Sequence, residues 1–181
     1  MIDEIFYKPR TGEEVKRASG GAPVYPYSQL NEMVEHLGIE NTLTMMFARS
    51  LKNIILLQDP RKMNSGHWLG LSYNPSKGEI YFFSSYGGKP DAEKNKWLTE
   101  DDQVESGQGV DVFNDGLKEL AKKGYVIHYN DHPYQFEGDE TATCGIWTVA
   151  FLNSDMNPDQ FYRYNVRHHQ GPVQYFYKYF L

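Results

Sequence analysis

One apolar segment near the C-terminal end constrains the fold more than any other feature of the chain. Residues 145–152 read Gly-Ile-Trp-Thr-Val-Ala-Phe-Leu, directly after Cys144 and a polar stretch at 137–143. A helix that is apolar on all sides must be covered on all sides. We therefore expect a buried central helix that begins at Cys144, with the other elements packed around it.

The neighbouring segments predict strands and further helices. Short runs rich in β-branched and aromatic residues predict strands at 52–58, 67–73, 79–84 and 125–129. The Asn-Pro-Ser-Lys-Gly turn at 74–78 joins two of them into a hairpin. Apolar residues recur at helical spacing in 29–37, after Ser28 as a cap and before Gly38, and again between Phe113 and Leu120. This order predicts an α+β fold with a central mixed sheet packed against helices.

The 181 residues fit a single domain, 1–181. Glycines and prolines among charges predict a loosely packed N-terminal segment at 1–25, and similar composition predicts mostly loop at 85–109. Aromatic residues make up 15% of the chain and crowd its C-terminus, which favours core packing over a ligand platform.

Composition excludes several classes of function. The single cysteine excludes an intramolecular disulfide and multi-cysteine metal sites, and the histidines have no zinc-type spacing, so we expect no metal and no cofactor. No apolar run approaches the ~18 residues of a membrane helix, and the N-terminus lacks a secretory signal. A net charge of −6 with dispersed basic residues argues against nucleic acid as a partner. We expect a reducing compartment, or a particle assembled in one.

The single cysteine has a suggestive position. A thiol at a helix N-terminus faces free backbone amides and the positive end of the helix dipole, which lowers its pKa. Gly145, directly after Cys144, would let a substrate backbone approach closely. The alternative from the local sequence is a buried structural cysteine.

Two further residues fit nucleophilic chemistry with Cys144. His67 starts the first hairpin strand, and counting back from the turn places it opposite Ser84 or Ser85. Gln135 lies nine positions before the cysteine, where its amide and the Cys144 backbone N–H can form an oxyanion hole.

These residues carry a resemblance to a known group of enzymes. The ordered set consists of Gly66-His67-Trp68, a hairpin, Gln135 and Thr143-Cys144-Gly145. It resembles the cysteine peptidases that include adenovirus-type maturation proteases and ubiquitin-like-protein proteases. Over residues 50–155 the chain looks most like the proteases of adenoviruses, virophages, polinton-like elements and large DNA viruses.

The resemblance implies a role for each residue. Cys144 would be the nucleophile, His67 the general base, and Gln135 the oxyanion donor. Trp68 would wall a narrow cleft that favours glycine before the scissile bond, although Trp68 is equally compatible with plain core packing. The resemblance also implies the expected fold, with the nucleophile at the N-terminus of the central helix.

The position of the third catalytic residue departs from the family pattern. The family has Asp, Glu or Asn there, and this chain has Ser84. A hydroxyl can accept a hydrogen bond from imidazole but cannot stabilise imidazolium by charge. The enzyme would then work as a Cys–His dyad with Ser84 orienting the ring, or use another acceptor such as Asp91 or a backbone carbonyl, or be impaired.

The sequence therefore predicts a cysteine endopeptidase that cleaves viral structural-protein precursors, in a virion or in the host-cell cytoplasm. An activating peptide would be a further partner. Two alternatives stay open: a protease of ubiquitin-like modifiers, and a catalytically weak relative that serves as a binding or assembly module.

Overall fold

The computed structural model describes residues 1–61, 66–138 and 141–181. Their centre is a five-stranded sheet in the order β1-β2-β3-β4-β5. The strands are β1 (Val24–Pro26), β2 (Lys52–Gln58), β3 (Gly66–Asn74), β4 (Glu79–Ser84) and β5 (Val126–Tyr129). The two outer pairs are parallel and the two inner pairs antiparallel, so the sheet is mixed as predicted.

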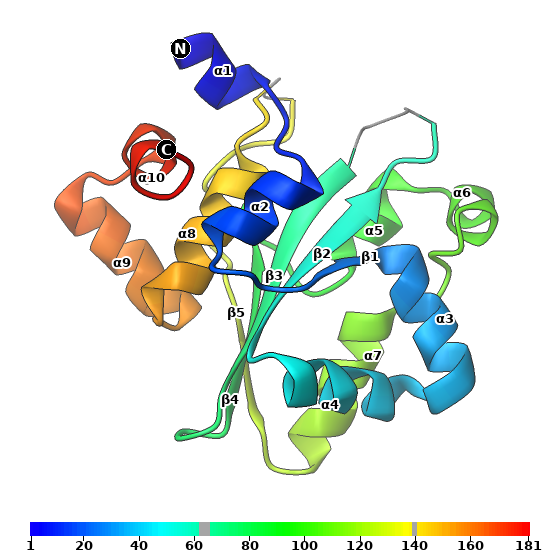
Figure 1. The fold of residues 1–181 in the computed structure, drawn as a ribbon. Coiled ribbons are helices and arrows are strands. Elements are labelled where there is room, and N and C mark those ends of the chain that lie inside the picture. The colour runs from blue at the N-terminus through cyan, green and yellow to red at the C-terminus, as the bar shows by residue number, and fades with distance from the viewer. Residues whose placement is uncertain (62–65, 139–140) are drawn as a thin grey trace.

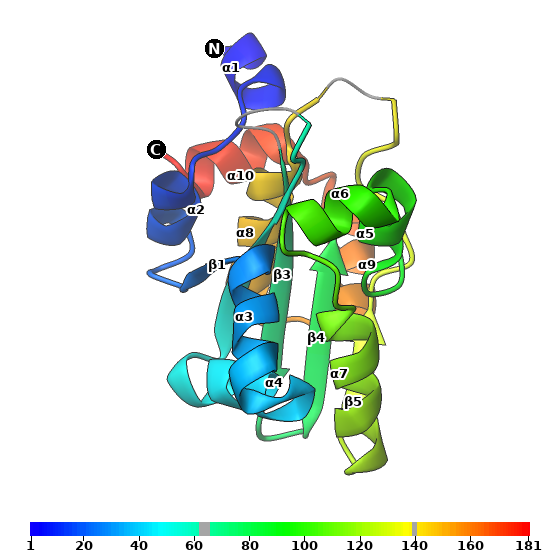
Figure 2. The same cartoon turned by 90° about the vertical axis from the view of Figure 1, so that its right-hand side faces the viewer.

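Helices cover both faces of the sheet (Figure 1). One face carries α2 (Gly12–Ala18), α8 (Cys144–Ser154), α9 (Pro158–His168) and α10 (Pro172–Tyr179). The other face carries α3 (Tyr27–Leu37), α4 (Ile39–Arg49) and α7 (Val112–Lys122), which lie in front of the strands in Figure 2. None of the described helices is long and apolar enough to cross a membrane.

The alternation of side chains along the strands gives each face its own core. Ile54 and Phe83 belong to the core under α8, whereas Ile55 and Phe82 belong to the core under α3, α4 and α7. Successive strand residues point to opposite faces, so two apolar runs supply both cores. The sheet is therefore fixed between two helical layers.

The central helix is confirmed. In α8, every residue from Gly145 to Leu152 is buried. The sheet packs on one side of this helix, and α2, α9 and α10 lie around the others (Figure 1). The helix is apolar on all sides, and the sheet and the neighbouring helices cover it on several of these sides.

The predicted strands are present: β2 and β4 have the predicted bounds, and β3 and β5 lie within one residue of theirs. The helix predicted at 29–37 begins earlier, at Tyr27, and Ser28 is not its cap. Its end at Gly38 is confirmed, and this residue has the positive φ of 81° that glycine tolerates.

The expectation of a loosely packed N-terminal segment is wrong. The segment forms α1 (Ile2–Tyr7), α2 and β1, and Ile5 and Val15 are fully buried. Arg10 is 4% exposed, and its guanidinium donates to the carbonyl oxygens of Glu4 and Lys8. These bonds close the turn between α1 and α2, and the Trp68 indole N–H, which donates to the Arg10 carbonyl at 3.1 Å, ties this turn to β3.

The expectation of a loop at 85–109 is also wrong in part. Two short helices form there, α5 (Ala92–Trp97) and α6 (Glu100–Glu105). Thr99 and Asp102 make a capping box at the start of α6. The α5 helix places two side chains, Glu93 and Trp97, beside His67.

Candidate active site

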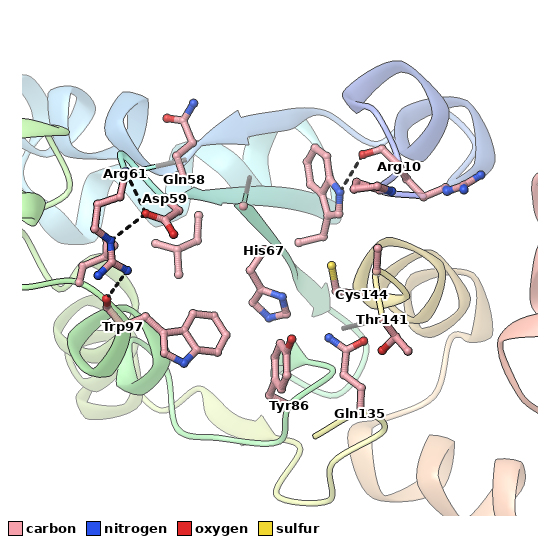
Figure 3. Close-up of a pocket in the computed structure, with 16 residues that line it drawn as sticks. Arg10, Gln58, Asp59, Arg61, His67, Tyr86, Trp97, Gln135, Thr141 and Cys144 are labelled. Atoms are coloured by element: carbon pink, nitrogen blue, oxygen red, sulfur yellow. Dashed lines mark hydrogen bonds and ion pairs between the residues drawn. The ribbon is translucent and has the colours of Figure 1, made fainter. Parts of the chain in front are cut away.

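A cavity of about 560 Å³ opens where β3 and α8 begin. It is lined by four of the six residues predicted from the sequence: His67, Trp68, Gln135 and Cys144. Figure 3 shows the labelled side chains of this cavity arriving from different elements. Segments far apart in the sequence thus meet at one end of the sheet.

Cys144 is the first residue of α8, as predicted, and is partly buried. Hydrogen bonds from the backbone N–H groups of Trp68, Gly145 and Cys144 itself favour the thiolate. Burial has the larger effect, so the pKa of the thiol is raised above its ordinary value. The expectation of a lowered pKa is therefore wrong for this resting structure, because desolvation outweighs the helix terminus.

His67 is buried at the start of β3, and its Nε2 atom lies 3.0 Å from the Ser84 hydroxyl oxygen. The rings of Tyr86 and Trp97 pack against the imidazole, with centroid separations of 4.9 and 5.4 Å. Burial lowers the pKa of His67 to about 3. The imidazole is therefore neutral in the resting site.

The predicted contact between His67 and Ser84 forms through a different strand register. Ser84 pairs with Leu69, two residues from the predicted partner, so His67 lies beyond the last paired position. Residues 67 and 69 share a face of β3, which makes Ser84 a diagonal neighbour of His67. Diagonal neighbours are within reach of long side chains, and the imidazole bridges the gap.

Glu93 is a site residue that sequence reasoning missed. It is 8% exposed on α5, and one of its carboxylate oxygens accepts a hydrogen bond from the Ser84 hydroxyl. The other oxygen, Oε2, lies 3.7 Å from His67 Nε2. Burial raises the pKa of this carboxyl to about 7. An acid thus stands behind Ser84, the residue considered from the sequence for the third catalytic position.

Asp91, the alternative acceptor considered from the sequence, does not serve His67. Its carboxylate accepts hydrogen bonds from the Tyr27 hydroxyl and from the backbone N–H groups of Phe113 and Asn114. These bonds cap the first turn of α7, which begins at Val112. Asp91 is therefore a structural residue that joins the α5 segment to two helices.

Gln135 is held from both sides. The backbone N–H groups of Tyr134 and Gln135 donate to the Ser85 carbonyl, which fixes the loop after β5 to the end of β4. The Thr143 hydroxyl donates to Gln135 Oε1 at 2.6 Å. The amide nitrogen therefore faces away from Thr143, and the Gln135 side chain makes a hydrogen bond with the Tyr86 phenol. A primary amide has a second proton, which is available to a ligand.

Trp68 both lines the cavity and packs in the core, so the two roles considered from the sequence are compatible. Its indole N–H donates to the Arg10 carbonyl at 3.1 Å. Gly145 is not among the residues that line the cavity, and a Cβ there would lie 3.0 Å from Trp68 Cδ1 and 3.1 Å from Arg10 Cβ. The glycine thus has a packing role, and its contact with a substrate backbone stays a prediction.

One group of metal-type side chains lies outside the cavity. Asp131, His132 and Asp159 bring ligand atoms within 4.8 Å of one another, and all three are exposed. The His132 ring stacks on Tyr162 with centroids 4.0 Å apart. His132 is thus an exposed residue that packs against α9.

No protein-family model matches the chain, and no curated protein matches its sequence. Among solved structures, the chain is similar to the SUMO protease Ulp1 with its catalytic cysteine oxidized to a sulfonic acid. The two are 16% identical over 77% of this chain and 62% of that chain, with a TM-score of 0.39.

A second similar structure is the C-terminal Ulp1 protease domain in complex with Smt3, the yeast ortholog of SUMO. It is 16% identical, covers 83% of this chain and 68% of that chain, and has a TM-score of 0.39. The chain thus spans about two thirds or less of the length of these proteases. At this level a likeness establishes no shared activity, and the case for a function rests on the site.

Proposed function

We propose that the protein is a cysteine endopeptidase. One observation supports this most strongly: His67, Gln135 and Cys144 come from separate elements and line the same cavity. Each has a second contact that suits its role, since Ser84 engages His67, Thr143 engages Gln135 and the N-terminus of α8 presents Cys144. A structural cysteine needs no such neighbours.

The proposed reaction uses the neutral resting pair. His67 takes the thiol proton as the sulfur attacks a peptide carbonyl carbon, which forms a C–S bond and an oxyanion. The Gln135 amide and the Cys144 N–H stabilise the oxyanion. His67 then gives its proton to the departing amine as the C–N bond breaks. Water attacks the thioester in the second step and restores the thiol.

The neutral pair also implies that proton transfer and attack occur together. Burial holds the pKa of His67 low and that of Cys144 high, so a stable ion pair is disfavoured before substrate enters. As His67 becomes a positively charged imidazolium, the negative charge forms on the substrate oxygen and not on the buried sulfur. Activity would then depend strongly on the oxyanion donors, Gln135 among them.

The walls of the cavity favour a small residue beside the scissile bond. Trp68, Tyr86 and Trp97 surround the catalytic pair, so a glycine before the scissile bond fits best. Two substrate classes meet this requirement. One is a viral structural-protein precursor, whose cleavage would place the protein in a virion or the host cytoplasm. The other is a ubiquitin-like modifier with a glycine-rich C-terminus.

A panel of substrates tests the proposal. Fluorogenic peptides ending in Gly-Gly, precursors of ubiquitin-like modifiers and viral structural precursors with glycine before the cleavage site would be incubated with the wild type and Cys144→Ala. We expect hydrolysis by the wild type alone, and the preferred precursor identifies the substrate class. Equal rates for both proteins on every substrate would contradict the proposal and favour a binding module.

A further inference from the structure

A buried carboxylate stands behind the serine at the third catalytic position. The Ser84 hydroxyl lies between His67 Nε2, at 3.0 Å, and Glu93, to which it donates a hydrogen bond. We propose that Glu93 is a positioning residue that acts through Ser84 to fix the tautomer and orientation of His67. We refer to the three hydrogen-bonded residues Glu93, Ser84 and His67 as the relay. The inference rests on the proposed thiol chemistry of His67 and Cys144.

Counting donors and acceptors gives the direction of each bond. An ionised carboxylate only accepts hydrogen bonds, so the single Ser84 proton goes to Glu93. The Ser84 oxygen must then accept from the other side, which requires a proton on His67 Nε2. The neutral imidazole has one N–H, so the lone pair is left on Nδ1. That atom is the one free to take the Cys144 proton.

Glu93 also supplies the charge that serine lacks. Its Oε2 atom lies 3.7 Å from His67 Nε2, close enough to stabilise the imidazolium that forms during the reaction. The site is buried, so this attraction is screened less than it would be in water. Ser84 and Glu93 together thus perform what a single acid would do at position 84.

The α5 segment is built to deliver this carboxylate. Asp91 stands directly before α5 and is bonded to α7 and Tyr27, and the Lys94 ammonium is buried against Asp111 and Gln103. Trp97, one helical turn after Glu93, packs edge-on against the His67 ring. Two residues of α5 therefore contact the His67 imidazole: Trp97 packs against the ring, and Glu93 lies on the side of Nε2.

The charged groups around Glu93 define how the relay depends on pH. The negative charges of Glu137 and Asp91 raise the pKa of Glu93 further, and the hydrogen bond from Ser84 lowers it. If Cys144 or Tyr86 lost its proton, the resulting anion would repel the Glu93 carboxylate. His67 is the basic group beside it. When Glu93 takes a proton, Ser84 is no longer obliged to accept from His67, and the tautomer is released.

The test observes His67 and Cys144 directly and needs no substrate. Nitrogen NMR of the histidine rings, assigned with His67→Gln, would be recorded across pH for the wild type, Glu93→Gln and Ser84→Ala. The exposed Glu35→Gln in α3 is the matched control for loss of one negative charge. Alkylation of Cys144, the one thiol of the chain, is followed by mass spectrometry at each pH.

We expect the wild type above pH 7 to hold the Nε2–H tautomer, and both relay variants to show a mixture. Their alkylation rates should fall by about tenfold or more at pH 8, because an unfixed imidazole places its lone pair wrongly in part of the molecules. The control should match the wild type. The double variant Ser84→Asp/Glu93→Gln moves the acid to position 84 and should restore the rate to within a few-fold.

An Nδ1–H tautomer in the wild type would overturn the proposal, as would relay variants with unchanged tautomer and rate. Failure of the double variant to recover, with its fold intact by circular dichroism, would also count against it. The peptidase proposal is judged separately by hydrolysis. A protein with the expected tautomers but no hydrolysis would retain the relay and lose the proposed function.

Discussion

Replacing Glu93 with the neutral glutamine should raise the free energy of unfolding, but only above about pH 4.5. Burial raises the pKa of this carboxyl from an ordinary 4.5 to about 7. Between these values the unfolded chain has lost the proton and the folded chain keeps it, so the free energy of unfolding falls as pH rises. Each pKa unit corresponds to about 1.4 kcal/mol, which makes the loss about 3 kcal/mol above pH 7.

Glu93→Gln removes this penalty while it keeps the shape of the side chain, and its amide can present either an oxygen or an NH2 group to Ser84. We expect the variant to match the wild type below pH 4.5, to gain stability through pH 4.5–7, and to be more stable by about 3 kcal/mol at pH 8. His67, whose lowered pKa makes stability rise with pH between about 3 and 6.5, is present in both proteins. Its contribution therefore largely cancels in the difference.

Urea unfolding followed by tryptophan fluorescence, repeated from pH 4 to 9, measures this difference. Glu35→Gln, an exposed carboxylate on α3, should give a flat difference across the same range. A flat difference for Glu93→Gln, or a loss of stability at pH 8, would refute the reasoning. It would mean that the carboxylate is better solvated or better paired than its burial implies.

Three further changes test the rest of the site. Gln135→Ala should lower kcat on a peptide substrate by about 10²–10³, the usual effect of losing one oxyanion donor. Gly87→Ala should destabilise the protein by about 1–3 kcal/mol in urea unfolding, because φ is +69° and a Cβ would lie 2.7 Å from the Pro133 nitrogen. Asp91→Ala should lower stability by about 1–3 kcal/mol in urea unfolding, because the Tyr27 hydroxyl and two backbone N–H groups of α7 lose their acceptor in a buried site.

Much of the scaffold could be predicted from the sequence because apolar patterns are strong there. The run at 52–58 and the hairpin around 74–78 became β2, β3 and β4, and the all-apolar segment became α8. The same patterns placed His67 and Cys144 at element starts. Both residues now line one cavity, because the strand and the helix begin at the same end of the sheet.

The α5 helix could not be predicted in this way. Ala92–Trp97 is six residues long, three of them charged, and no apolar period marks it. Its position comes from tertiary bonds, above all those of Asp91 and the buried Lys94. A glutamate is exposed by default in a sequence analysis, so nothing marked Glu93 as buried. The capping boxes at Thr11 and Thr99, by contrast, were readable signals for α2 and α6.

The pKa of Cys144 shows a different limit. The helix terminus was visible in the sequence, and the backbone N–H groups of Gly145 and Cys144 there do favour the thiolate, as does that of Trp68 on β3. How deeply the sulfur is buried depends on the cavity walls, including Trp68 and residues of the N-terminal segment such as Arg10. Those walls come from parts of the chain that are distant in sequence, so the larger of the two opposing effects was hidden.

The serine at position 84 is best understood together with Glu93. An aspartate at 84 would put a second carboxylate within hydrogen-bond distance of the first, and one of the two would have to hold a proton. With serine there, one negative charge serves the site, and the hydroxyl has a single arrangement that satisfies both neighbours. The carboxylate is destabilising where it lies, as its raised pKa shows, and carboxyls with strongly perturbed pKa values cluster at functional sites. On the proposal that Glu93 acts through Ser84, the acid that position 84 lacks is supplied from α5, with the serine as its link to His67.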